Sequence, residues 1–204
     1  GMFGHRKLRA LSTAAPPSLE IHLVRHAQAH NDNGIDTHGP ELTPHGRRQA
    51  RRLAKRPTGA QYTGIYSSDL TRARQTADAI ALHHADNLLT VTRDLREVSG
   101  QHTALHMSRL TINSDRSLIE EQQAMHRVIN HLRETHEQGE RVLIVSHGNI
   151  TRSLIPLLGG LAPAKAPLLE IYNASLSIVD AWPSGRAVVR LANCVAHLPE
   201  RLIT

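Results

Sequence analysis

Arginine and histidine side chains follow several apolar segments of the sequence, at the points where those segments end. The segment LEIHLVR ends at Arg25 and is followed by His26, and the segment RVLIVS is followed directly by His147. Arg72 comes a few residues after a third apolar segment, TGIYSS. An arginine guanidinium matches phosphate oxygens through two parallel hydrogen bonds. A histidine held among cations tends to stay neutral, as a nucleophile must be. These residue types indicate phosphate chemistry, provided that the fold brings them together.

Two carboxylates follow a fourth apolar segment. Asp94 and Glu97 lie in the stretch DLREVSGQH, and a carboxyl group close to a bound phosphate could protonate a leaving alkoxide. Taken singly, each of these side chains is more often structural, because a histidine at a strand end usually lies at the surface and an arginine there usually pairs with an acid. Their joint placement is what favours a functional site.

The elements that would position these residues alternate between strands and helices. Apolar alternation or short apolar runs predict strands, and capping residues followed by apolar periodicity predict helices. The predicted strands cover residues 19–25, 63–67, 88–92, 141–146, 175–182 and 186–193, the last two joined as a hairpin. The predicted helices cover about 44–56, 69–84, 115–138 and 150–158.

Capping residues predict where these helices begin and end. Thr43 is expected to cap the first helix, Ser68 or Asp69 the second, and Ser114 or Asp115 the third. Gly139 is expected to end the third helix. The inward side chains of the third helix are expected to be Leu118, Met125, Val128, Ile129 and Leu132.

This alternation predicts an α/β fold, a three-layer sandwich in which helices flank a mainly parallel central sheet. Ligands of such sheets bind beyond the carboxyl ends of the strands. The loops that follow Val24, Tyr66, Thr92 and Val145 should therefore converge on one site. That site would combine two arginines, two histidines, a carboxylate and the N-terminus of the helix after His147, whose backbone N–H groups can bind phosphate oxygens.

The length of 204 residues favours one domain. Residues 2–18 contain basic residues but no acid and end in two prolines, which predicts a flexible tail over 1–18, with a targeting segment as the alternative. Gly1, ahead of Met2, is interpreted as a remnant of expression. Residues 19–204 are then expected to form the single domain.

The composition narrows the partners. A surplus of 24 basic over 18 acidic residues, a net charge of +6, favours anionic partners. Nucleic acid is disfavoured because the few Phe, Trp and Tyr residues are scattered, whereas single-strand binders stack bases on aromatic side chains. The arginines at 47, 48, 51 and 52 are interpreted as a solvated helix face.

No segment approaches the ~20 apolar residues of a membrane span, and the single Cys194 excludes an intramolecular disulfide framework. We expect a cytoplasmic protein.

Four motifs in this order resemble those of the histidine phosphatase superfamily, the phosphoglycerate mutase-like proteins. LVRHAQA resembles the family's Leu-Val-Arg-His-Gly/Ala-Glu/Gln motif, and LTPHGRRQA resembles its Leu-Thr-x-x-Gly-x-x-Gln-Ala segment. YSSDLTRARQTA is similar to its Ser-Ser-x-Leu-x-Arg-Ala-x-x-Thr-Ala segment, and VLIVSHGNITRSL is similar to its second histidine motif. The resemblance extends over about residues 19–198.

The resemblance implies a role for each matching residue. His26 would be the nucleophile that becomes phosphohistidine, and Arg25 and Arg72 would hold the phosphoryl oxygens. His147 would be a further phosphate ligand that stabilises the transition state, and Gly148 would lend its backbone N–H. Glu97 would be the general acid. No metal and no cofactor is implied.

The sequence departs from the family's pattern at two places. The family often has an asparagine about six residues after the nucleophile, whereas Asn31 is five residues after His26. Asn31 would therefore be a phosphate ligand only if the loop after His26 is one residue shorter here than in the family. Gly100 comes one residue early for the family's spacing after Glu97, and Asp94 is therefore the reserve candidate for the proton donor.

The resemblance implies a metal-independent phosphatase that hydrolyses a phosphomonoester of a small metabolite or a phosphoprotein. The short stretch between Glu97 and the next predicted helix leaves the site open to water, which favours hydrolysis over phosphoglycerate mutase-type transfer. A non-catalytic phospho-ligand binder of the same fold is a competing hypothesis. A metal-dependent hydrolase is another, although the sequence offers no His-Glu-x-x-His pair on a helix. We expect no nucleic-acid or membrane partner, and the oligomeric state is left open.

Overall fold

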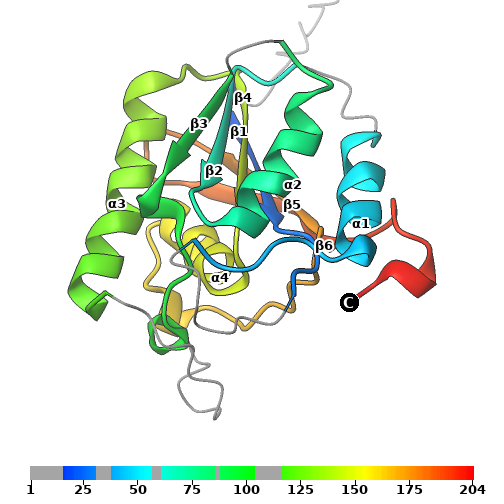
Figure 1. Ribbon diagram of the computed structural model, residues 1–204. Coiled ribbons are helices and arrows are strands. Elements are labelled where there is room, and N and C mark those ends of the chain that lie inside the picture. The colour runs from blue at the N-terminus through cyan, green and yellow to red at the C-terminus, as the bar shows by residue number, and fades with distance from the viewer. Residues whose placement is uncertain (1–15, 31–37, 57–60, 86–87, 104–115) are drawn as a thin grey trace, which may run out of the picture.

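The structure of the chain is a computed structural model that describes residues 16–30, 38–56, 61–85, 88–103 and 116–204 (Figure 1). Its sheet consists of the strands β1 (Leu19–Arg25), β2 (Gly64–Ser68), β3 (Leu89–Thr92), β4 (Arg141–Ser146), β5 (Leu176–Ala181) and β6 (Ala187–Cys194). Its α-helices are α1 (Pro44–Ala54), α2 (Thr71–Ala81), α3 (Leu118–Thr135) and α4 (Gly148–Leu158).

The sheet is mixed, with the strand order β3-β2-β4-β1-β5-β6. The pairs β1–β4, β2–β4 and β2–β3 are parallel, while β5 pairs antiparallel with β1 and β6 pairs antiparallel with β5. The predicted α/β sandwich, including the C-terminal hairpin, is therefore confirmed. Because β1, β2, β3 and β4 run the same way, the loops that follow them all lie at one edge of the sheet.

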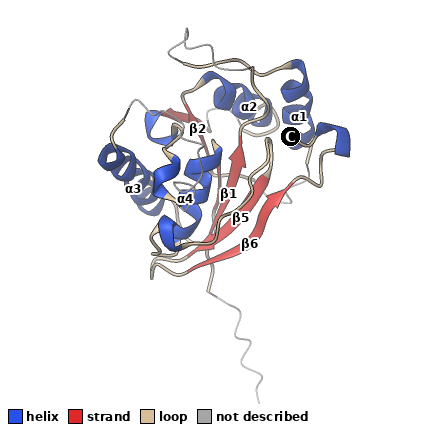
Figure 2. Cartoon of the chain, turned by 90° about the horizontal axis from the view of Figure 1, so that it is seen from below, coloured by secondary structure: helices blue, strands red, loops and turns tan. Residues whose placement is uncertain are grey.

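Helices cover both faces of the sheet, as the view from below in Figure 2 shows. One apolar core joins α3 and α4 to one face through residues such as Met125, Ile129 and Leu154. The other joins α1 and α2 to the opposite face through Leu53, Ala77 and others. Burial of apolar side chains in these two cores provides the main stabilisation of the three layers.

Helix α1 begins where the sequence predicts. Thr43 is its N-cap and its side chain accepts a hydrogen bond from the N–H of Gly46 at 2.9 Å, while Pro44 occupies the first helical position. The N-cap of α2, in contrast, is Leu70 rather than Ser68 or Asp69. Ser68 still belongs to β2, and the Asp69 carboxylate is occupied by a two-pronged ion pair with Arg96 at 2.7 and 2.8 Å.

The expected limits of α3 were wrong at both ends. Ser117 caps the helix, in a reciprocal arrangement with Glu120, whereas Ser114 and Asp115 lie outside the described residues. Leu118, expected to point inward, is 43% exposed because it lies in the first turn, beyond the sheet core. The helix ends at His136 in an extended conformation, and Gly139 provides the positive φ of the turn that follows.

The structure describes only the last three residues, 16–18, of the predicted N-terminal tail. Residues 1–15 lie outside the described residues, but the carbonyl of Pro16 accepts a hydrogen bond from the indole N–H of Trp182 at 3.0 Å. The contacts with the body of the protein therefore begin at residue 16 at the latest. In the part of the chain that the structure describes, no helix combines the length and the apolar character that crossing a membrane demands.

Candidate active site

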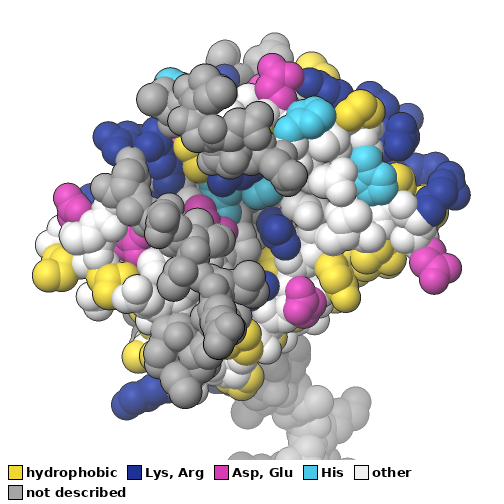
Figure 3. Space-filling model, turned by 60° about the horizontal axis from the view of Figure 1, so that its bottom comes forward, with side chains coloured by type: hydrophobic (Ala, Val, Ile, Leu, Met, Phe, Trp, Pro, Cys, Tyr) yellow, Lys and Arg dark blue, Asp and Glu magenta, His cyan; other side chains and the backbone are white. Residues whose placement is uncertain are grey.

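Four residues singled out from the sequence come together at the carboxyl ends of the parallel strands. Arg25 ends β1 and His26 follows it, Arg72 lies in the first turn of α2, and His147 is the N-cap of α4 after β4. The rings of His26 and His147 lie 5.1 Å apart, and Arg72 Nε lies 3.2 Å from His26 Nε2. Figure 3 shows basic, histidine and acidic side chains close together near the centre of this face.

The hydrogen bonds of His26 define its tautomer. Nδ1 lies 2.7 Å from the carbonyl oxygen of Ala27, and because a carbonyl only accepts, Nδ1 carries the hydrogen. Nε2 therefore has a free lone pair, toward which Arg72 Nε–H is directed. This places the nucleophilic atom of the ring beside a guanidinium that could also hold a phosphoryl oxygen.

Burial keeps His26 neutral. Its side chain is 8% exposed, and burial, reinforced by the charges of Arg72 and Arg25, lowers its pKa to about 3. A neutral imidazole is the form that can attack phosphorus. The charged neighbours thus suit both a phosphate ligand and a histidine nucleophile.

Hydrogen bonds from four separate parts of the chain hold the backbone of residues 26–28 in place. The N–H of His26 donates to Ser146 O at 2.8 Å, and Asn173 Nδ2 donates to His26 O at 2.9 Å. The N–H of Ala27 donates to Thr76 Oγ1 at 3.0 Å, and the N–H of Gln28 donates to the buried side chain of Gln49 at 2.8 Å. These bonds explain why the sequence carries a threonine on α2 and a glutamine on α1 facing the strand end. Asn173 was not predicted as a site residue, and its only local signal is its place at the start of the segment NASLS, just before a predicted strand.

His147 is fully buried. Its Nε2 lies 2.9 Å from Ser68 Oγ, which already accepts from the N–H of Leu70, so the serine hydroxyl can donate its own hydrogen to Nε2. When the serine hydroxyl donates to Nε2, Nδ1 carries the hydrogen, and this Nδ1 has no hydrogen-bond partner among the described residues. Burial and the cationic surroundings lower the pKa of His147 well below its ordinary value. A buried donor without a partner is suited to an incoming anion.

Arg25 and Arg152 flank the first turn of α4. Arg25 Nη1 donates to Ile171 O at 2.5 Å, whereas its buried Nε has no partner among the described residues. A Cβ on Gly148 would lie 3.1 Å from Arg152 Nη1 and 3.7 Å from Arg25 Nε, so glycine leaves the room that both guanidinium groups need. Arg152 is held by Leu169 O at 2.7 Å and Asn149 Oδ1 at 3.0 Å. This third arginine was not predicted from the sequence, although its spacing of four residues from Gly148 on a helix could have revealed it.

Glu97 is bound by the N-terminus of α4. Its Oε1 accepts hydrogen bonds from the N–H groups of Asn149 at 3.0 Å, Ile150 at 3.1 Å and Val98 at 3.1 Å. Burial raises the pKa of Glu97 despite these three bonds and the nearby Arg25. Two N–H groups of the first turn of α4, those of Asn149 and Ile150, thus bind the carboxyl group. This differs from the expectation that the helix N-terminus as a whole faces the phosphate.

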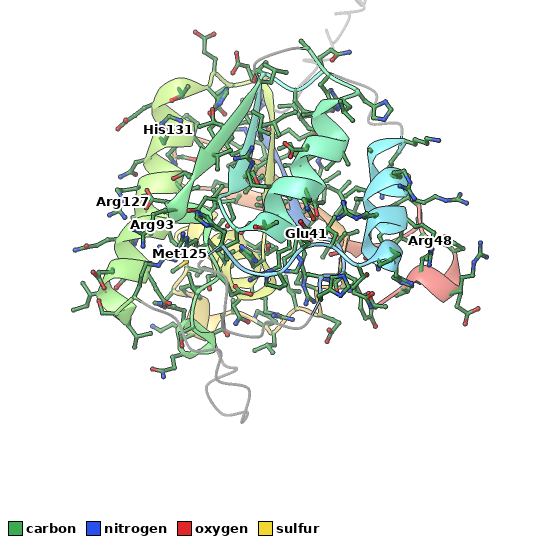
Figure 4. All side chains as sticks on the ribbon, in the orientation of Figure 1. Glu41, Arg48, Arg93, Met125, Arg127 and His131 are labelled. Atoms are coloured by element: carbon green, nitrogen blue, oxygen red, sulfur yellow. The ribbon has the colours of Figure 1, made fainter. Side chains whose placement is uncertain are left out.

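The two remaining candidates are placed differently. Asp94 forms a two-pronged ion pair with Arg127 of α3, labelled in Figure 4, at 2.8 and 3.0 Å. It lines a groove between β3 and α3 rather than the centre around His26. Asn31 lies outside the described residues. Within the described ranges, no three His, Cys, Asp or Glu side chains are grouped so as to hold a metal ion.

Comparisons with known proteins show which family and which fold the chain resembles. Residues 21–194 match the model of the histidine phosphatase superfamily, branch 1. The serine/threonine-protein phosphatase Pgam5, mitochondrial, of Caenorhabditis elegans is 26% identical over 196 residues, covering 93% of this chain and 68% of the relative. A protein of Escherichia fergusonii named "Probable phosphoglycerate mutase GpmB" is 31% identical over 206 residues, covering 88% of this chain and 95% of the relative. The structure of a mycobacterial glucosyl-3-phosphoglycerate phosphatase superposes with a TM-score of 0.68 at 21% identity, covering 87% of this chain and 99% of the other.

Proposed function

Because the chain belongs to the histidine phosphatase superfamily, branch 1, we propose that it hydrolyses a phosphomonoester through a phosphohistidine on Nε2 of His26. The observation that carries this proposal is the state of the ring: Nδ1 donates to Ala27 O, the pKa is lowered, and the Nε2 lone pair lies beside Arg72. An unprotonated Nε2 beside a guanidinium combines a nucleophilic atom with a group that can hold a phosphoryl oxygen.

In the first step, the Nε2 lone pair of His26 attacks phosphorus as the bond from phosphorus to the ester oxygen breaks. Glu97 gives its proton to the departing oxygen, so that an alcohol leaves. Because Oε1 of Glu97 accepts three backbone N–H groups, Oε2 is the atom that carries this proton. The raised pKa of Glu97 favours the protonated form that the step requires.

The charge on the transferring phosphoryl group is met by groups already in position. Arg72, the unpartnered Nε of Arg25 and the Nδ1–H of His147 would hold its oxygens, together with the N–H of Gly148. Ile171 O fixes Arg25 and Ser68 Oγ fixes His147, so these two donors need little reorganisation as charge shifts during transfer.

In the second step, water attacks the phosphorus of phosphohistidine. The Glu97 carboxylate accepts a proton from this water, the bond from Nε2 to phosphorus breaks, and inorganic phosphate forms. His26 returns to its neutral form and Glu97 to its protonated form, so the cycle is balanced.

The substrate class that we propose is a phosphomonoester of a small metabolite or of a phosphoprotein. Both kinds occur in the names of the relatives, one a serine/threonine-protein phosphatase and another a glucosyl-3-phosphoglycerate phosphatase. Residues 30–40 and 98–115 follow His26 and Glu97 in the chain, and we expect these two loops to select among substrates; they lie largely outside the described residues.

The test of the nucleophile is His26→Ala. Turnover of phosphomonoesters and the acid-labile, alkali-stable phosphate on the protein should both disappear, whereas the fold should survive because the residue follows the strand rather than filling the core. The matched control is His83→Ala, a change to an exposed histidine beyond α2, which should keep full activity. Full activity of His26→Ala would end the phosphohistidine proposal.

A second candidate, phosphoglycerate mutase-type transfer, is favoured by the relative named for that activity. The two reactions differ in their products. Incubation with 3-phosphoglycerate and a bisphosphoglycerate primer should release inorganic phosphate if the protein is a phosphatase that accepts this substrate, and should yield 2-phosphoglycerate if it is a mutase.

The cationic groups of the site replace the charge that a metal would otherwise supply. We therefore expect phosphatase activity to be unchanged after incubation with EDTA and exhaustive dialysis. Loss of activity on chelation, with recovery after addition of zinc or magnesium, would favour a metal-dependent hydrolase.

A further inference from the structure

A second concentration of positive charge lies between α1 and the C-terminal segment, residues 195–204, away from His26. A hollow of about 840 Å³ is lined there by Arg48, Arg51, Arg52, Lys55, Arg56, Ala196, His197, Arg201 and Leu202. Figure 3 shows basic side chains gathered along this edge of the molecule, and Arg48 is labelled beside the C-terminal segment in Figure 4. Among the described residues that line the hollow there is no carboxylate and no group of the candidate active site.

The helix period explains why these cations gather on one side of α1. Residues 48, 51, 52 and 55 follow the spacing of a single helix face, while Gln49, Ala50 and Leu53 face the core. Like charges at this spacing repel one another. Arg47, on a neighbouring part of the helix, is paired with Glu41 at 3.1 Å, whereas Arg48, Arg51 and Arg52 have no ion-pair partner in the described part of the chain.

The base of the hollow is held in place by hydrogen bonds. His197 Nε2 lies 2.8 Å from Ala174 O, so this nitrogen donates and Nδ1 accepts from Arg56 Nη1 at 3.3 Å. The same Nη1 lies 3.2 Å from Cys194 Sγ. Burial, together with the charge of Arg56, lowers the pKa of His197, which therefore stays neutral as an acceptor. Arg56 is thus fixed at the base, whereas the arginines of α1 are exposed around it.

We propose that this hollow binds a compact ligand with several phosphate groups, such as a short polyphosphate chain. Five arginines and one lysine line it, and a phosphate group brings a charge of about −1.5 to −2. Three or four phosphates therefore balance the lining. Guanidinium groups match phosphate oxygens in a two-pronged geometry, and the volume falls within the roughly 300–1,000 Å³ of small-molecule sites.

The lining disfavours other anions. Its described residues include no Phe, Tyr or Trp side chain on which a nucleobase could stack. A peptide supplies one charge per carboxylate and would need about six acidic residues to balance the six cations, whereas a chain of three or four phosphates carries the same charge on far fewer atoms.

The experiment measures the binding of tripolyphosphate by titration calorimetry. The background is His26→Ala, so that no ligand is hydrolysed. Arg48→Gln, Arg51→Gln and Arg52→Gln are combined in one variant, since glutamine keeps the helix propensity and all three side chains are exposed. The matched control combines Arg133→Gln, Lys165→Gln and Arg186→Gln, which removes the same charge from positions elsewhere.

The hollow variant should lose one equivalent of bound tripolyphosphate, or bind that equivalent at least tenfold more weakly, while the control variant should match the parent. Equal weakening in both variants would show that only net charge matters and would overturn the proposal. A parent that binds no tripolyphosphate outside the active site would also overturn it. If hexaglutamate binds the hollow more tightly than tripolyphosphate does, the partner is an acidic peptide and the proposed ligand class is wrong. In the presence of His26, the hollow variant should hydrolyse p-nitrophenyl phosphate like the parent, which verifies its fold.

Discussion

At the scale of single residues, the sequence locates the arginines and histidines of the site but cannot choose its proton donor. Asp94 and Glu97 belong to one short stretch, and either could face His26 as far as spacing is concerned. Their partners come from distant elements: Arg127 of α3 holds Asp94, and the N-terminus of α4 holds Glu97. Such contacts depend on how α3 and α4 pack on the sheet, so they leave no trace in the local sequence.

The choice of Glu97 can be tested with two leaving groups. An alkoxide needs a proton as the bond to phosphorus breaks, whereas nitrophenolate barely does. Glu97→Gln should therefore slow the hydrolysis of alkyl phosphates by about 10²- to 10⁴-fold and that of p-nitrophenyl phosphate much less. Initial rates on both substrates measure this difference.

The matched control for that experiment is Asp94→Asn, which removes a carboxylate from the same stretch but one that is paired with Arg127. Its rates on both substrates should stay close to those of the parent. If the selective loss on alkyl phosphates appears in Asp94→Asn instead, Glu97 is not the proton donor.

At the scale of elements, strands were easier to predict than helix ends. A buried strand such as RVLIVS is marked by its apolar residues alone, and β4 covers the predicted range. Several polar residues near a helix start compete for the N-cap, and tertiary contacts decide among them. Asp69 is taken by Arg96, so α2 begins without a side-chain cap, and α3 begins later than predicted because Ser117 and Glu120 cap each other.

One side chain of α1 connects three elements. Gln49 accepts from the N–H of Gln28 and donates to Leu202 O at 2.7 Å, and it is fully buried. Gln49→Leu would leave both backbone groups without a partner, which costs about 1–3 kcal/mol for each buried group. We expect a lower free energy of unfolding, measured by urea denaturation.

Arg47→Gln is the control on the same helix. Arg47 is exposed and pairs with Glu41, and such surface pairs contribute only about 0–1 kcal/mol. Unfolding of Arg47→Gln near that of the parent, together with a clear loss for Gln49→Leu, would locate the effect in the buried amide. Equal stability of Gln49→Leu and the parent would show that water replaces the lost bonds.

At the scale of the whole molecule, the alternation of strands and helices was sufficient to predict the fold class, but not the surroundings of α1. The arginines at 48, 51 and 52 were interpreted as a solvated helix face, and they are indeed exposed. The C-terminal segment, however, lies beside that face and adds Arg201 and His197 to it. The pairing of residues so far apart in the chain cannot be inferred from helix periodicity, which describes one element at a time.

Neutral buried histidines should make the stability of the whole molecule depend on pH. The pKa of His26 is about 3 in the folded protein against an ordinary value of 6.5, so in mildly acidic solution the unfolded chain binds a proton that the folded protein does not. The stability that this difference contributes is fully present above pH 6.5 and is lost as the pH falls toward 3. The free energy of unfolding should therefore decrease by about 1.4 kcal/mol per pH unit for this residue, with a contribution of the same sign from His147.

Urea denaturation in phosphate-free buffer between about pH 7 and pH 5 measures this slope, in a range where most carboxylates remain charged. His26→Asn removes one titrating group and should reduce the slope by about one proton, whereas His83→Asn, which changes an exposed histidine, should leave it unchanged. An unchanged slope in His26→Asn would mean that His26 is protonated in the folded protein near pH 6. A protonated ring has no lone pair on Nε2, so the same result would remove the basis for a phosphohistidine at this position.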